Sequence, residues 1–115
     1  MYEVLSIAGS SSMGGAGIQA DLKTFQERGV YGMGAITAFV TVSPKRGRHI
    51  YPQPLEVVAA QCESALAGTG ITALKTGMLH SVAHIQYVAK IVKHYKLPQV
   101  VVDPVIVTKS GAELL

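Results

Sequence analysis

The hydrophobic residues of this chain follow two spacings that alternate along the sequence. Short apolar runs rich in β-branched residues, which are typical of strands, lie at 4–9, 34–42, 73–76 and 100–102. Between them, apolar residues recur three or four positions apart, as they do on one face of a helix. These helical stretches are 18–25, 55–66 and 82–92.

Strands that alternate with helices predict an α/β fold, in which a mainly parallel sheet carries helices on both faces. A short edge strand is expected at residues 49–51, before the Pro52 and Pro54 breakers. The runs at 34–42 and 100–102 are almost continuously apolar, so we expect both strands to be buried on both faces. An outer strand this apolar would also leave one edge of the sheet unprotected.

The composition indicates one globular domain. The chain has 115 residues, of which 49% are hydrophobic and 15% charged, and it contains no repeat or linker. The net charge is +3, but the basic residues are scattered and cluster only at 44–49. A solvated loop is the favoured interpretation of that cluster, with mild attraction of anions as the alternative. Because no basic stripe alternates with aromatic residues, no nucleic-acid partner is expected.

Cysteine and histidine usage argues against disulfides and a metal cage. Cys62 is the single cysteine and lies in a helical pattern, so we expect a small core residue in a reducing cytoplasm. No basic leader and no apolar run of membrane-spanning length is present, so no membrane association is expected. His84 and His94 fall on a predicted helix and are expected at its surface. No HExxH or GxSxG motif occurs.

Ligands of parallel sheets bind beyond the carboxyl ends of the strands, where the connecting loops converge. The first such loop contains Gly14, Gly15 and Gly17 ahead of a helix, where backbone N–H groups can approach a ligand. The pattern matches neither the P-loop nor the dinucleotide fingerprint. Ligand contact and a simple tight turn therefore remain equally open for these glycines.

Three charged residues near this edge are candidates for chemistry. Asp21 lies on the flank of the apolar helix face, and a ligand role and a structural role remain equally open for it. Asp103 ends an all-valine strand, where a carboxylate can hold Mg²⁺; a turn residue before Pro104 is the alternative. Lys109 can meet a phosphate, and an exposed loop lysine is at least as good an interpretation.

Three segments together identify a family resemblance. The stretches IAGSSSMGGAGIQADLKTFQERGVYGMGAITA, ALKTGML and VVVDPVIVTKSG resemble the N-terminal half of the ribokinase-like vitamin kinases. These are the phosphomethylpyrimidine kinases of thiamine synthesis and their relatives that act as pyridoxal kinases. The resemblance covers residues 1–115 and implies a three-layer α/β/α fold with a mainly parallel sheet. It also implies phosphorylation of a ring hydroxymethyl group by ATP with Mg²⁺, in a cytoplasmic homodimer.

The resemblance further implies roles for individual residues at the ring site. Gly9 and Ala16 would lend backbone contacts to the substrate ring, Asp21 would bond its substituents, and Val105 would supply a backbone group. Asp103 would lie towards the metal and phosphate side. No catalytic residue is expected in this chain, because the family places it, with the nucleotide site, in the C-terminal half.

Departures from the family pattern bear on the substrate. Pyrimidine kinases carry a Gln where this chain has Val42, which cannot hydrogen-bond an aminopyrimidine. His49 matches the position of a loop histidine that contacts the substrate in the pyridoxal kinase branch, and Ser11 replaces the usual Asp. These features favour pyridoxal or pyridoxine, with hydroxymethylpyrimidine and its phosphate close behind.

The resemblance also bears on activity, since family members are longer than this chain. We expect the 115-residue chain by itself to lack kinase activity, because it holds only the substrate side. The alternative is a non-catalytic half-domain that binds the ring or self-associates through its open sheet edge.

Overall fold

The computed structural model describes residues 1–68 and 70–105 and shows eight elements in the predicted alternating order. Four strands run parallel and β3 runs antiparallel to β2, in the sheet order β3-β2-β1-β4-β5. The elements are β1 (Glu3–Ser11), α1 (Gly17–Glu27), β2 (Tyr31–Ser43), β3 (Gly47–Pro52), α2 (Leu55–Ala67), β4 (Ile71–Thr76), α3 (Val82–His94) and β5 (Gln99–Val102). The predicted α/β class is confirmed.

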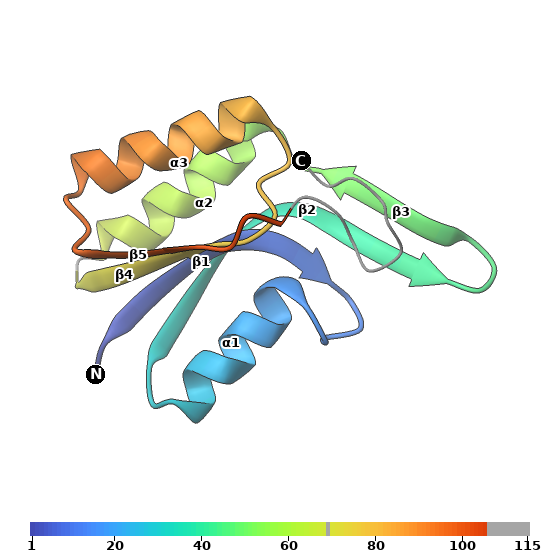
Figure 1. The fold of residues 1–115 in the computed structure, drawn as a ribbon, viewed down its shortest axis with the longest axis horizontal. Coiled ribbons are helices and arrows are strands. Elements are labelled where there is room, and N and C mark those ends of the chain that lie inside the picture. The colour runs from blue at the N-terminus through green and yellow to red at the C-terminus, as the bar shows by residue number, and fades with distance from the viewer. Residues whose placement is uncertain (69, 106–115) are drawn as a thin grey trace.

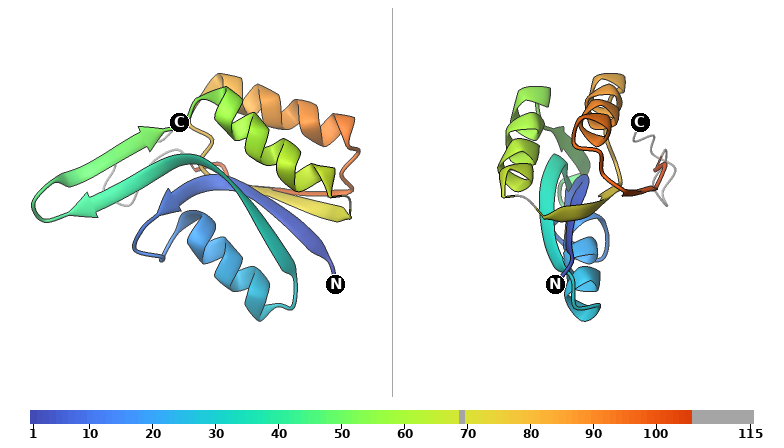
Figure 2. Two further views of the ribbon diagram at one scale, coloured as in Figure 1. Left: turned by 180° about the vertical axis from the view of Figure 1, so that it is seen from behind. Right: turned by 90° about the vertical axis from the view of Figure 1, so that its left-hand side faces the viewer.

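The helices form two outer layers around the sheet. Figure 1 shows α1 on one face and α2 with α3 on the other, and the views in Figure 2 agree. The predicted face of α1 packs on the sheet, where Leu22 and Phe25 contact the surface left open by Gly32. No helix within residues 1–68 and 70–105 is long and apolar enough to cross a membrane.

The main core lies between the sheet and the α2–α3 layer. Leu5 and Ile7 of the central strand are fully buried there with Leu74 of β4 and Val58 of α2. Burial of each such side chain contributes about 1.5–3 kcal/mol to folding. This core fixes the central strands, and it thereby positions the loops at their carboxyl ends.

Residues 100–102 form a strand, as predicted, but the prediction that this strand is buried is wrong. Val101 and Val102 of β5 are 63% and 64% exposed. β5 pairs only with β4 among the described residues, and α1 covers β1 and β2 instead. Continuous apolar sequence indicates a strand that can be covered, but the number of neighbouring layers decides whether it is.

The prediction of a surface position for His84 is also wrong, whereas His94 is exposed as expected. His84 is 6% exposed because it lies one helical turn before Val88, on the inner face of α3. Its Nδ1 lies 2.5 Å from the Ser81 hydroxyl, which caps the helix, and its Nε2 lies 3.2 Å from the Gln53 carbonyl oxygen. The ring therefore ties the start of α3 to the segment before α2.

The long strand β2 is covered along its middle only. Ala35, Thr37 and Ala38 are buried, but the outer part pairs with β3 in a hairpin that projects beyond the helices, as Figure 1 shows. Phe39 and Val42 on this part are 42% and 48% exposed, which corrects the expectation of burial on both faces. The hairpin reaches out from the carboxyl edge of the sheet.

Cys62 is a buried core residue, as predicted, and this burial makes stability depend on pH. Loss of solvation and the nearby Glu63 raise the pKa of its thiol from 9.0 to about 12. The unfolded chain therefore releases this proton at lower pH than the folded chain, so stability should fall as the pH rises from 9.0 towards about 12. Burial acts in the same direction on Tyr87, whose pKa rises to about 12.

Urea unfolding of the chain and of Cys62→Ala, at neutral pH and at about pH 10, measures this effect. The alanine variant should be less stable at neutral pH, because it leaves a cavity, and should lose less stability on the alkaline side. Equal alkaline losses in the two chains would contradict the prediction.

Candidate functional site

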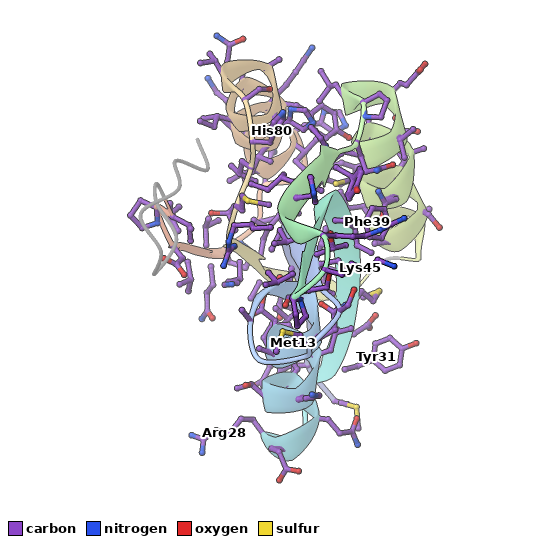
Figure 3. All side chains as sticks on the ribbon, turned by 90° about the vertical axis from the view of Figure 1, so that its right-hand side faces the viewer. Met13, Arg28, Tyr31, Phe39, Lys45 and His80 are labelled. Carbon is purple, nitrogen blue, oxygen red and sulfur yellow. The ribbon has the colours of Figure 1, made fainter. Side chains whose placement is uncertain are left out.

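A pocket of about 690 Å³ opens at the carboxyl ends of the parallel strands. Its walls come from the β1–α1 connection, the start of α1, the β2–β3 hairpin, the ends of β1 and β4, and the segment after β5. Figure 3 looks at the molecule from the hairpin side, with Met13 of the β1–α1 connection facing the viewer and Lys45 on the hairpin turn. This is the edge at which the sequence predicts ligand binding.

Most of the predicted ring-site residues lie together in this pocket. The lining includes Gly9, Ala16, Asp21, Val42, Asp103 and Val105. His49 is not among the lining residues, and Lys109 lies outside the described residues. Segments more than 80 positions apart therefore meet at one site, and the roles assigned to them by the resemblance stay predictions.

The glycines of the β1–α1 connection divide into two kinds. Gly17 has a φ of +64°, and a Cβ there would lie 2.2 Å from the Gly9 carbonyl oxygen. This glycine is needed because the start of α1 is bridged closely to β1 at Ser10. Gly15 has neither constraint: no atom lies within 4 Å of its Cβ position, and the residue lines the pocket. The fold therefore requires glycine at position 17. It does not require glycine at position 15, where the absence of a side chain leaves more room in the pocket.

Gln19 fastens the first turn of α1 to the end of β1. Its Oε1 accepts from the Ser11 backbone N–H at 2.9 Å, and its Nε2 donates to the Ser10 hydroxyl at 2.7 Å. These two bonds satisfy polar groups where β1 leaves the sheet. They tie the end of β1, where the connection that borders the pocket begins, to the first turn of α1.

Asp21 projects from α1 towards the sheet and has two partners there. Its Oδ2 accepts from the Ser6 hydroxyl at 2.6 Å and from Lys75 Nζ at 2.8 Å. The side chains of Asp21 and Lys75 are 17% and 22% exposed, and both residues line the pocket. No protein donor within residues 1–68 and 70–105 bonds Oδ1, so that oxygen is free to accept from a ligand.

The hairpin places Val42 and His49 on opposite faces. Val42 pairs with Arg48 across the two strands, and both line the pocket. His49 pairs with Thr41, one position along, so its side chain points to the other face. There its Nε2 lies 2.7 Å from the Arg46 carbonyl oxygen. The structure thus brings Val42 to the site and does not bring His49 there.

Asp103 contributes a single carboxylate to the pocket wall. Its backbone N–H bonds the Thr76 carbonyl oxygen at 3.1 Å, which extends the β4–β5 pairing to the pocket. Within the part of the chain that the structure describes, no three His, Cys, Asp or Glu side chains gather as metal ligands. One carboxylate fits a Mg²⁺ ion that takes its other ligands from water and nucleotide phosphates.

Sequence reasoning assigned no role to Ser6, Lys75, Arg48 and Met78. Ser6 and Lys75 lie inside predicted strands, and only the parallel register Ser6↔Lys75 reveals that they are neighbours. Arg48 belongs to the basic cluster interpreted as a solvated loop, and strand alternation with Val42 could have placed it on the pocket face. A second, open hollow of about 720 Å³ between β2 and α2 has no comparable set of charged groups.

The whole of this architecture has counterparts among known proteins. A family model described as phosphomethylpyrimidine kinase matches residues 11–115. The pyridoxine kinase of Bacillus subtilis is 47% identical over 117 residues, and the hydroxymethylpyrimidine/phosphomethylpyrimidine kinase of the same organism is 47% identical over 116. The structure of Staphylococcus aureus pyridoxal kinase in complex with pyridoxal is similar with a TM-score of 0.88 and 44% identity, over 95% of this chain and 41% of that one.

The two Bacillus subtilis kinases match all of this chain, but the chain matches only part of each of them. The alignments span 100% of the chain, and 43% and 42% of the two Bacillus subtilis kinases. The chain thus spans less than half the length of these curated relatives. Because the family model covers most of the chain and the pocket-lining elements, the chain belongs to the phosphomethylpyrimidine and pyridoxal kinase family.

Proposed function

We propose that this chain forms the substrate side of a kinase that transfers a phosphoryl group from ATP to the hydroxymethyl group of a vitamin ring. The ring is pyridoxal or pyridoxine, or else hydroxymethylpyrimidine or its phosphate. The observation that carries the proposal is the Asp21 carboxylate, held in the wall of the pocket with Oδ1 free. Family membership supports the reaction class.

The residues of the chain bind and orient the ring in this proposal. Asp21 Oδ1 accepts a hydrogen bond from a ring substituent, while the backbone at Gly9, Ala16 and Val105 surrounds the ring. Val42 and Met78 supply apolar wall that excludes water from it. MgATP would supply the phosphoryl group, and Asp103 would hold the Mg²⁺ ion on the phosphate side.

Calorimetric titration of the chain with pyridoxal and with hydroxymethylpyrimidine tests the proposal. Saturable one-site binding of either ring is the expected result. Absence of binding by a folded chain, with both rings, would overturn the proposed ring site.

The preferred ring depends on Val42 in this proposal. The two Bacillus subtilis kinases are equally identical to the chain, so overall identity favours neither ring. A valine on the pocket face offers no hydrogen bond to an aminopyrimidine, which supports pyridoxal or pyridoxine. The role of His49 in this preference stays a prediction, because its ring faces away from the pocket.

Val42→Gln should raise the affinity for hydroxymethylpyrimidine relative to pyridoxal about tenfold, because it adds one hydrogen bond to the ring. Titration of both rings into both chains measures this ratio. Thr41→Gln is the matched control, since it changes the neighbouring position on the opposite face. An unchanged ratio in Val42→Gln would show that position 42 does not select the ring.

We expect the 115-residue chain alone to show no ATP-dependent phosphorylation of pyridoxal. Phosphoryl transfer requires that both substrates be positioned and that charge on the transferred group be stabilised. The chain covers 43% of its Bacillus subtilis pyridoxine kinase relative, and its pocket accounts for one of the two substrates. Mass spectrometry measures whether the phosphorylated product forms. Product formation by the purified chain would contradict this expectation.

A second candidate function is a non-catalytic half-domain that self-associates through its sheet edge. The exposed Val101 and Val102 on β5 favour it, because such an edge can pair with another strand. Light scattering distinguishes a monomer from an edge-paired oligomer, and this candidate function predicts the oligomer. Val101→Lys should then convert the oligomer to a monomer, because a charged residue on the edge strand opposes pairing.

A further inference from the structure

One ion pair joins α1 to β4 in the wall of the pocket, and no role is assigned to its lysine. Lys75 Nζ lies 2.8 Å from Asp21 Oδ2, and this is the one salt bridge within the described residues. Lys75 stands beside Ser6 in the parallel register of β1 and β4, on the face that α1 covers. Both donors therefore reach the same carboxylate oxygen from adjacent strands.

This ion pair determines the net charge of the pocket wall beside a ligand that bonds Asp21. A lone carboxylate in a partly buried wall would favour a cationic ligand, because a positive group would offset its desolvation. Here the Lys75 ammonium already compensates the Asp21 charge. A ligand that bonds Oδ1 needs only a neutral N–H or O–H donor, and an added cation would be repelled by the ammonium, which also lines the pocket.

A purely structural role for the pair is the competing explanation. The two residues are only 17% and 22% exposed, so the pair could serve to fasten α1 to β4. α1 is, however, already attached to the sheet by Gln19 at its start and by Leu22 and Phe25 against Gly32. Lys75 also lines the pocket, and a residue that only fastens α1 to β4 would not need to do so.

We infer that Lys75 is a specificity-determining residue, which makes the ring site select net-neutral rings with a hydrogen-bond donor over cationic ones. The inference rests on the proposed function, since it concerns the same pocket. It is a statement about ligand charge, and it therefore differs from a general contribution of Lys75 to stability or affinity.

Two probes that differ in charge test the inference. Pyridoxine is net neutral near pH 7, whereas pyridoxamine carries a protonated amine there. The unsubstituted chain should bind pyridoxine more tightly than pyridoxamine. Lys75→Met, which keeps an unbranched stem and removes the terminal ammonium group with its charge, should shift this preference towards pyridoxamine by about tenfold.

Two further variants separate charge from structure. Lys75→Arg keeps the charge and should retain the preference for pyridoxine. Lys90→Met removes one positive charge from the exposed face of α3, at a residue that does not line the pocket, and should leave the preference unchanged. Urea unfolding of each variant establishes that the titrated chains are folded.

Each outcome of these titrations decides the inference. A changed ratio in Lys75→Met with an unchanged ratio in Lys75→Arg supports it. Equal weakening of both probes in Lys75→Met would show a structural role and overturn the inference while the proposed ring site stands. Failure of the unsubstituted chain to bind either probe would overturn the ring site and the inference together.

Discussion

Gly17→Ala should destabilise the fold by roughly 3 kcal/mol or more, since a left-handed residue and a backbone clash are combined. The φ of +64° at Gly17 disfavours any side chain, and the new Cβ would lie 2.2 Å from the Gly9 carbonyl oxygen. A backbone atom of the central strand cannot move aside as the end of a side chain can. The variant should therefore lose the bridge between Ser10 and residue 17 and deform the pocket.

Gly15→Ala is the matched control, because it is the same substitution two positions earlier in the same connection. Its Cβ would meet no atom within 4 Å, and its φ is not positive. Urea unfolding followed by circular dichroism should show a large loss for Gly17→Ala and little change for Gly15→Ala. Similar losses in both variants would contradict the division of the glycines into structural and pocket-lining kinds.

Asp21→Asn should weaken pyridoxal binding by about 10- to 100-fold, the usual range for a hydrogen bond to a charged group. The single carbonyl oxygen of asparagine would be retained by the donors of Ser6 and Lys75. Its NH₂ group would then occupy the position of Oδ1 and present a donor where the ring also presents one. Titration of pyridoxal into both chains measures the loss.

Glu63→Gln controls for the change in net charge, because Glu63 is exposed on α2 and is absent from the pocket lining. It should bind pyridoxal as the unsubstituted chain does. Binding by Asp21→Asn at full affinity would show that Asp21 serves the fold alone, which is the structural alternative that the sequence leaves open.

Local sequence patterns predicted the elements well where neighbouring residues decide the outcome. The inner face of α1 and the core position of Cys62 follow from helical spacing, and both are confirmed. His84 shows the limit of the same reasoning, because a polar residue on the inner face is buried when Ser81 and Gln53 satisfy both of its nitrogens. A hydrophobicity pattern carries no information about such partners.

Long-range arrangement decided the rest. The apolar run of β5 was sufficient to predict a strand, but its exposure depends on which strands and helices lie beside it. The position of His49 outside the pocket depends on the register of the hairpin, which a shift by one residue would reverse.

The candidate site shows the same division. Glycines before a helix, a carboxylate on its flank and an aspartate at a strand end are local features, and the one-dimensional pattern placed them at the carboxyl edge of a parallel sheet. The contact of Asp21 with Ser6 and Lys75 joins residues 15 and 54 positions apart. Strand pairing places Ser6 beside Lys75, and the packing of α1 on that face of the sheet brings Asp21 within hydrogen-bond distance of both. Neither the register nor the helix packing can be read from a local pattern, because both depend on the packing of the whole domain.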